Sequence, residues 1–161
     1  MSSKTIIVEE SVASTLISFG FPFCFPLALG DEVVITVSYA VSDGTTSIAN
    51  TATVTLDGTN EAPTVTAITD TGKTEDSAAY TIDLLNGAAD ADSDTLSVTN
   101  SSITAVDQAG NAYTLPNGAA SVSGSTLSID PSTLSEMALG DEVVITVSYD
   151  VSDGTTTTAN T

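Results

Sequence analysis

Short segments in which apolar and polar residues alternate run through much of the chain, and this period of two predicts β-strands. In the clearest segment every second residue is apolar: Val33, Ile35, Val37, Tyr39 and Val41. The sequence SDG at residues 42–44 supplies turn chemistry. Apolar residues then alternate with threonine from Thr51 to Leu56. We therefore predict a β-hairpin over residues 28–56.

Further short strands are predicted between residues 80 and 129. Alternation or short apolar runs occur at residues 80–84, 96–98, 103–107, 120–122 and 127–129. Turns rich in glycine and asparagine separate these runs, and no segment has sustained helical periodicity, although residues 131–137 can form one helical turn. Many short strands at roughly even spacing are typical of an all-β sandwich.

The predicted hairpin occurs twice. Residues 28–51 read ALGDEVVITVSYAVSDGTTSIANT, and residues 138–161 read ALGDEVVITVSYDVSDGTTTTANT. The two copies differ only at positions 40, 47 and 48 and their counterparts, and the offset of 110 residues is close to the size of one β-sandwich domain. Such a period indicates a tandem array, and we expect the chain to be cut from one.

This repeat sets the expected domain organisation. Residues 57–63 are polar and turn-rich, and we interpret them as a linker between repeats. Residues 28–56 would be the C-terminal hairpin of a preceding repeat. Residues 64–161 would be a nearly complete sandwich that lacks most of its last strand, a strand that residues 47–56 are suited to supply. Residues 1–27 match neither copy and form a divergent N-terminal segment, a candidate for disorder.

Composition and charge exclude several classes of function. The chain has 161 residues, no histidine and one cysteine, which excludes zinc centres, histidine-based catalysis and an intramolecular disulfide. Two lysines stand against 21 acidic residues, for a net charge of −19, so we expect no nucleic-acid partner. An apolar fraction of 41% argues against a disordered acidic tail, and we expect no transmembrane segment. The acids belong either to a solvated surface or to sites for a hard cation such as calcium.

Several motifs resemble one family. The stretch DGTNEAPTV at 57–65 resembles the GTNDAP linker of VCBS and cadherin-like tandem repeats in large bacterial RTX-type surface adhesins. VSDG at 41–44 and at 151–154, TEDS at 74–77 and DADSD at 90–94 are similar to further motifs of the same repeats, in the same order. The resemblance implies an immunoglobulin-like or cadherin-like β-sandwich, type I secretion to the extracellular space or cell surface, and bound Ca²⁺. The segment before Ala28 matches nothing in the family.

The acids of the second repeat are expected to converge. In a seven-strand sandwich the start of the first strand, the loop between the second and third strands and the last hairpin turn share one end. Carboxylates gathered there repel unless a cation lies among them. The predicted calcium ligands are Asp57, Asn60, Glu61, Asp90, Asp92, Asp94 and Asp153. Glu75 is a further candidate at the opposite end. The alternative is that all of these are solvated loop residues.

The sequence thus predicts a structural module rather than an enzyme. We expect a calcium-stabilised extender repeat of a bacterial adhesin, with neighbouring repeats and a cell-surface or matrix ligand as partners, acting in cell adhesion or biofilm formation. The alternative is a β-sandwich that binds carbohydrate or protein. Paired carboxylates also serve glycoside hydrolysis, but acids at every second residue of one loop suit a cation better.

Overall fold

The computed structural model describes residues 3–9 and 27–161, and the chain divides into two compact units. The first unit is Met1–Glu61 and the second is Ala62–Thr161. The boundary between them falls inside the predicted linker 57–63. Each unit is described on its own below.

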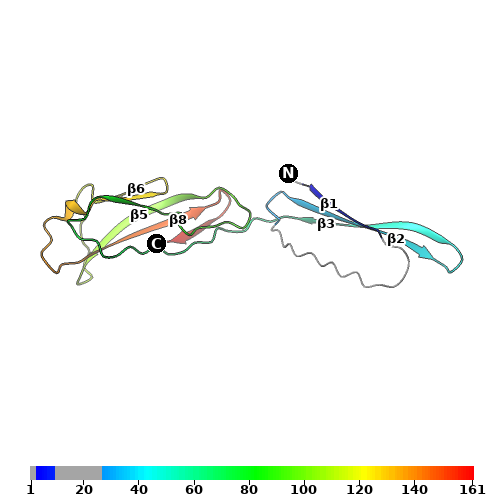
Figure 1. The fold of residues 1–161 in the computed structure, drawn as a ribbon, viewed down its shortest axis with the longest axis horizontal. Coiled ribbons are helices and arrows are strands. Elements are labelled where there is room, and N and C mark those ends of the chain that lie inside the picture. The colour runs from blue at the N-terminus through cyan, green and yellow to red at the C-terminus, as the bar shows by residue number, and fades with distance from the viewer. Residues whose placement is uncertain (1–2, 10–26) are drawn as a thin grey trace. The chain divides into compact units, whose positions relative to one another are not determined.

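The first unit is built on the predicted hairpin. Strand β2 (Glu32–Ser42) pairs antiparallel with β3 (Ser47–Asp57), and each strand has 11 residues in the ladder. The sheet has the order β1-β2-β3, because β1 (Ser3–Glu9) pairs parallel with the outer edge of β2 (Figure 1). The period-two pattern of the sequence thus corresponds to a long two-stranded ladder.

Strand β1 lies within the N-terminal segment 1–27, which the sequence offers as a candidate for disorder. Residues 3–9 read SKTIIVE and hold a run of β-branched side chains, which favour extended backbone. The strand then finds a partner in β2, with Ser3 opposite Glu32 and Glu9 opposite Ser38. The remainder of the expected divergent segment, residues 10–26, lies outside the described residues.

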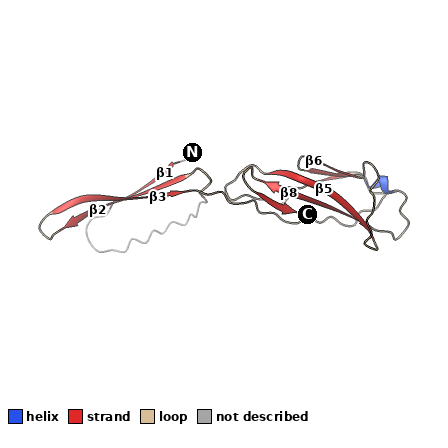
Figure 2. Cartoon of the chain, turned by 180° about the vertical axis from the view of Figure 1, so that it is seen from behind, coloured by secondary structure: helices blue, strands red, loops and turns tan. Residues whose placement is uncertain are grey.

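The second unit contains two antiparallel three-stranded sheets. One has the order β4-β7-β6, formed by β4 (Tyr80–Asp83), β7 (Thr126–Ile129) and β6 (Ala120–Ser123). The other has the order β5-β8-β9, formed by β5 (Ser97–Asp107), β8 (Val143–Ser152) and β9 (Thr157–Asn160). The prediction of an all-β chain is confirmed, and Figure 2 shows η1 (Pro131–Leu134) as the helical segment among these strands.

The core of the second unit lies between these two sheets. The buried cluster draws residues from both of them: Leu84, Leu127, Ile129, Val147, Tyr149 and Val151. The Tyr149 hydroxyl crosses the core and donates a hydrogen bond of 2.9 Å to the backbone carbonyl of Leu84. Packing of two antiparallel sheets through one apolar core is consistent with a β-sandwich.

Two local features differ from the sequence-based expectation. The predicted strands at 96–98 and 103–107 belong to one strand, β5, whose register shifts between Thr99 and Ser102. Asn100 has a φ of +51° at this bulge, a conformation that asparagine tolerates better than most residues. After the linker, Thr64 forms only an isolated bridge with Ala89, and no strand begins before β4.

The helical turn predicted at residues 131–137 is present as η1. Asp130 caps it, because its carboxylate accepts a hydrogen bond from the backbone N–H of Ser132 at 3.2 Å. In the described part of the chain, no helix has the length and apolar character needed to cross a membrane.

Candidate metal centre

The loop between β4 and β5 carries the DADSD sequence at residues 90–94. Its start is anchored by a two-way backbone bridge, in which Thr64 N–H donates to Ala89 at 2.8 Å and Ala89 N–H donates to Thr64 at 3.0 Å. This bridge ties the loop to the segment that directly follows the buried Pro63. The position of Asp90 is therefore fixed by a backbone contact between two segments that lie far apart in the sequence.

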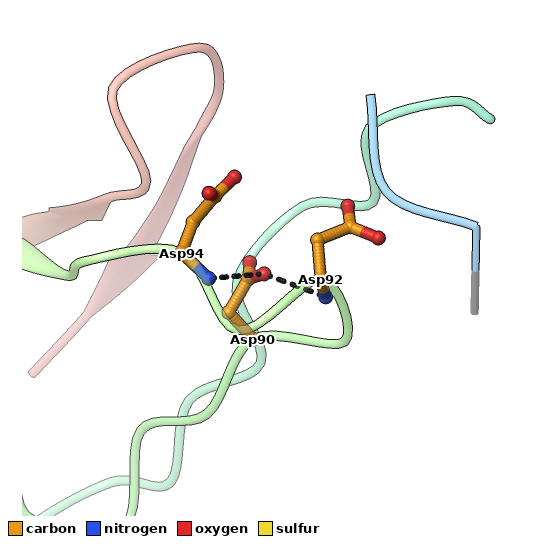
Figure 3. A group of neighbouring side chains, drawn as sticks. All are labelled: Asp90, Asp92 and Asp94. Atoms are coloured by element: carbon orange, nitrogen blue, oxygen red, sulfur yellow. Dashed lines mark hydrogen bonds between the residues drawn. The ribbon is translucent and has the colours of Figure 1, made fainter. Parts of the chain in front are cut away.

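The loop then curls around the Asp90 carboxylate. Asp90 Oδ1 accepts hydrogen bonds from the backbone N–H of Asp92 at 2.8 Å and of Asp94 at 3.3 Å (Figure 3). Ser93 adopts a φ of +66°, which closes the turn. This Asx-type geometry is the usual role of aspartate in turns. Here it also places three carboxylates from alternate positions side by side.

The three carboxylates form a group that can hold a metal ion. One oxygen from each of Asp90, Asp92 and Asp94 lies within 4.8 Å of the others. Oxygens that share a calcium ion lie 2.3–2.6 Å from it, and opposite ligands are then about 5 Å apart, so the spacing is compatible with a common ion. Asp90 and Asp92 are half-buried, whereas Asp94 is exposed.

One oxygen of Asp90 has no donor within the described chain. Asp90 Oδ2 is buried and accepts no hydrogen bond from the described residues, and Asp92 Oδ1 is buried too. A buried carboxylate oxygen without a donor carries a desolvation cost that a cation would offset. The donor set consists of hard carboxylate oxygens, the type that calcium prefers. These residues therefore fit such an ion chemically, although they supply only part of its six to eight ligands.

The predicted ligands from the linker all belong to the first unit. Asp57 ends β3, lies opposite Glu32 and is exposed. Asn60 is half-buried, and its side-chain amide donates to the backbone carbonyl of Glu61 at 2.9 Å. Glu61 accepts from the Thr59 hydroxyl at 3.2 Å. Their role as calcium ligands stays a prediction.

Asp153 is buried in the turn between β8 and β9 and lies outside the carboxylate group. Its Oδ1 accepts from the backbone N–H groups of Thr155 and Thr156, each at 2.6 Å, and its Oδ2 accepts from the Thr156 hydroxyl at 2.7 Å. The carboxylate thus holds the hairpin turn together. Glu75, which is half-buried in a turn before β4, also lies outside the group. Metal binding by either residue stays a prediction.

The counterpart of Asp153 in the first unit is exposed and gives a pH prediction. Asp43 accepts from the backbone N–H groups of Thr46 at 2.7 Å and Thr45 at 2.8 Å. These bonds, that of Thr46 foremost, hold the pKa of Asp43 below its ordinary value of 3.8. Because the folded pKa lies below the unfolded one, the stability gained from this carboxylate is present above about pH 4 and is lost as the pH falls through the folded pKa.

An NMR titration of the Asp43 carboxyl carbon measures this effect. We expect a midpoint below 3.8 in the folded chain and a return to the ordinary value in the urea-unfolded chain. A folded midpoint equal to the unfolded one would contradict the prediction.

The sequence did not indicate the surroundings of Tyr80. The Lys73 ammonium lies 4.7 Å from the centroid of the Tyr80 ring, within cation–π range. Burial, together with a hydrogen bond and charge from Asp70, raises the pKa of Tyr80 to about 12. Lys73 therefore has an aromatic partner, a contact that sequence spacing alone does not reveal.

Comparison with known proteins adds no relative. No family model, no curated protein and no solved structure matches the chain.

Proposed function

We propose that the chain is a structural repeat module of a secreted or surface-attached bacterial adhesin, in which sandwich domains of immunoglobulin-like or cadherin-like type follow one another as an extender. The observation that carries this proposal is the duplicated hairpin. It recurs at an interval of 110 residues, and its second copy forms β8 and β9 of the second unit. A module whose parts recur at this interval serves length and spacing rather than one catalytic site.

Calcium is the second part of the proposal. The ion would bind Asp90, Asp92 and Asp94, neutralise their charges and provide a partner for the buried Asp90 Oδ2. Asp57, Asn60, Glu61 and Asp153 are proposed as further ligands, so that the ion would stiffen the junction between neighbouring repeats. Extracellular calcium modules bind at about 10⁻⁴–10⁻³ M, which suits a rod that is ordered only outside the cell.

The test is thermal unfolding of the whole chain at 10 mM Ca²⁺ and in excess chelator. With the affinity above, calcium is expected to stabilise the second unit by about 1.4–2.7 kcal/mol. For a domain of about 100 residues this corresponds to a rise in Tm of roughly 6–20 °C. The substitution Asp92→Asn removes one ligand charge and is expected to abolish most of that rise.

The matched control is Asp76→Asn, which changes the charge by the same amount at an exposed aspartate outside the group. It should keep the full response to calcium. The calcium proposal is wrong if the wild-type Tm is the same in calcium and in chelator. Equal responses of the two variants to calcium would show that the ion binds somewhere other than the Asp90–Asp94 loop.

A further inference from the structure

The hairpin of the first unit has one apolar face. Cross-strand partners share a face of the ladder, so the register of β2 and β3 places one set of side chains together. We call this set the hairpin face; it consists of Val33, Ile35, Val37, Tyr39, Val41, Ile48, Asn50, Ala52, Val54 and Leu56. None of these residues is charged, and the part near the turn is open to solvent, with Val41 58% and Ile48 73% exposed.

The second unit shows what covers the same face when it is buried. Residues 142–149 are identical to residues 32–39, yet Tyr149 is 2% and Val151 0% exposed, because they pack against Leu127 and Ile129 of the β4-β7-β6 sheet. The internal geometry of the two hairpins also agrees. Asn160 donates to the Tyr149 hydroxyl at 2.8 Å, and its counterpart Asn50 donates to the Tyr39 hydroxyl at 2.9 Å. The chain thus holds two equivalent hairpins but only one sheet of this kind among the described residues.

We propose that the hairpin β2–β3 of one copy binds the β4-β7-β6 sheet of a second copy, in place of that copy's own β8–β9. For this, β1 leaves the edge of β2 that it occupies, and β2 then presents to β5 the same residues that β8 presents. Val37, Tyr39 and Val41 then occupy the positions of Val147, Tyr149 and Val151. The result is self-association by exchange of an equivalent element, a route that creates few new contacts and needs no new surface.

The ladder of the first hairpin runs over the full length of β2, and all 11 of its residues pair with β3. Four residues of β8 pair with β9, which ends at Asn160. Within the described chain, Val143–Ser148 of β8 pairs with β5 alone. In the exchanged form, Ala52, Val54 and Leu56 of β3 would lie beside the corresponding part of β2 and extend the cover over the core.

The exchange also has costs, one of which is the loss of the ladder of seven residue pairs between β1 and β2. Ala40 replaces Asp150, so the hydrogen bond of 2.8 Å from the Asn100 amide to Asp150 is lost. Ile48 replaces Thr158, whose hydroxyl donates to the Pro63 carbonyl at 2.7 Å. The net charge of −19 opposes the approach of two copies. We therefore expect weak, slow association that increases with salt and protein concentration.

The linker is too short for a hairpin to bind the sheet of its own chain in this way, so the exchange must take place between two chains. In the bound position the site of Ile48 lies beside Pro63, because its counterpart Thr158 contacts the Pro63 carbonyl. Asp57 would then lie nine residues along the strand, about 31 Å away. The six residues from Gly58 to Pro63 span about 20 Å at most. A hairpin therefore cannot bind the sheet of its own chain in this way.

Disulfide trapping between two variants of the full chain tests the exchange, with Cys24→Ser in all chains. Thr104 of β5 and Thr146 of β8 are partners in the ladder, and Thr36 is the counterpart of Thr146. A mixture of the Thr36→Cys and Thr104→Cys chains is expected to form a cross-linked heterodimer under mild oxidation. The double variant Thr104→Cys/Thr146→Cys gives the reference yield for this pair within one chain.

The matched control replaces Thr36→Cys with Thr53→Cys. Thr53 pairs with Thr36 on β3, which places it two strands from β5 in the exchanged form and beyond disulfide reach. We expect at least tenfold more heterodimer with Thr36→Cys than with Thr53→Cys, and a mass by light scattering that rises with concentration. A monomer at all concentrations would overturn the proposal. A dimer with equal yields for the two variants would also overturn it and would indicate that two hairpin faces pair with each other.

Discussion

Replacing Tyr149 with alanine is expected to destabilise the second unit by about 3–5 kcal/mol. The same change at Tyr39 should cost the first unit less than about 1 kcal/mol. The two tyrosines occupy the same position in the duplicated hairpin, with identical neighbours from residue 28 to 39 and from 138 to 149. The difference therefore isolates the effect of the opposing sheet.

The contacts of the two rings explain the expected difference. Tyr149 is 2% exposed, donates a hydrogen bond to the Leu84 carbonyl and accepts one from Asn160. Its removal would leave a cavity in a close-packed core and a buried carbonyl without its donor. Burial also raises the pKa of Tyr149, so its hydroxyl remains a donor at neutral pH. Tyr39 is 36% exposed, and water can replace most of its contacts.

Urea unfolding monitored by methyl NMR of Leu127 and Ile129 reports the stability of the second unit without using the mutated residue. Tyr149→Phe separates the hydroxyl from the ring and is expected to cost about 1–2 kcal/mol. Similar losses for Tyr149→Ala and Tyr39→Ala, each measured in its own unit, would contradict the assignment of the core to the second unit.

The sequence predicts the hairpins well but not their surroundings. Alternation from Val33 to Val41 requires one apolar face, and the structure has it. Whether that face is covered depends on residues 80–129, which lie far away in the sequence. The local alternation of apolar and polar residues is the same whether or not another sheet covers the apolar face of the strand. This is why identical segments are buried in one unit and exposed in the other.

Strand pairing between distant segments and local irregularities could not be predicted from the sequence either. Strand β1 has a suitable composition, but its parallel pairing with β2 across about 29 residues leaves no local signal. The bulge at Asn100 divides the apolar pattern of β5, so one strand resembles two. By contrast, the Asp90–Asp94 group was predictable, because an aspartate that caps its own turn brings alternate residues together.

The burial of Asp153 was not predicted, because aspartate in an SDG turn is common and is usually exposed. Its counterpart Asp43 is indeed exposed, whereas Asp153 is only 8% exposed. Both carboxylates accept from two backbone N–H groups and one threonine hydroxyl. The same hydrogen bonds thus occur in two environments that differ in access to water.

The substitution Asp153→Ala is expected to cost the second unit about 2–4 kcal/mol, because it leaves partly buried donors on Thr155 and Thr156 without an acceptor. Asp43→Ala should cost the first unit less than about 1 kcal/mol, since water reaches the donors there. Both values come from urea unfolding of the full chain with NMR probes in each unit. Equal costs would contradict the argument that burial sets the strength of these turns.

The variant Asp153→Asn distinguishes a role of this residue in the turn from a role in binding calcium. The amide keeps an acceptor oxygen for the two backbone N–H groups but removes the charge. If Asp153 is a calcium ligand as well, this variant should lose part of the calcium-induced rise in Tm that the Asp76→Asn chain retains. If the carboxylate acts only in the turn, the variant keeps the full rise. The response to calcium thus decides whether the last hairpin turn helps to bind the ion at the junction between repeats or only connects β8 to β9.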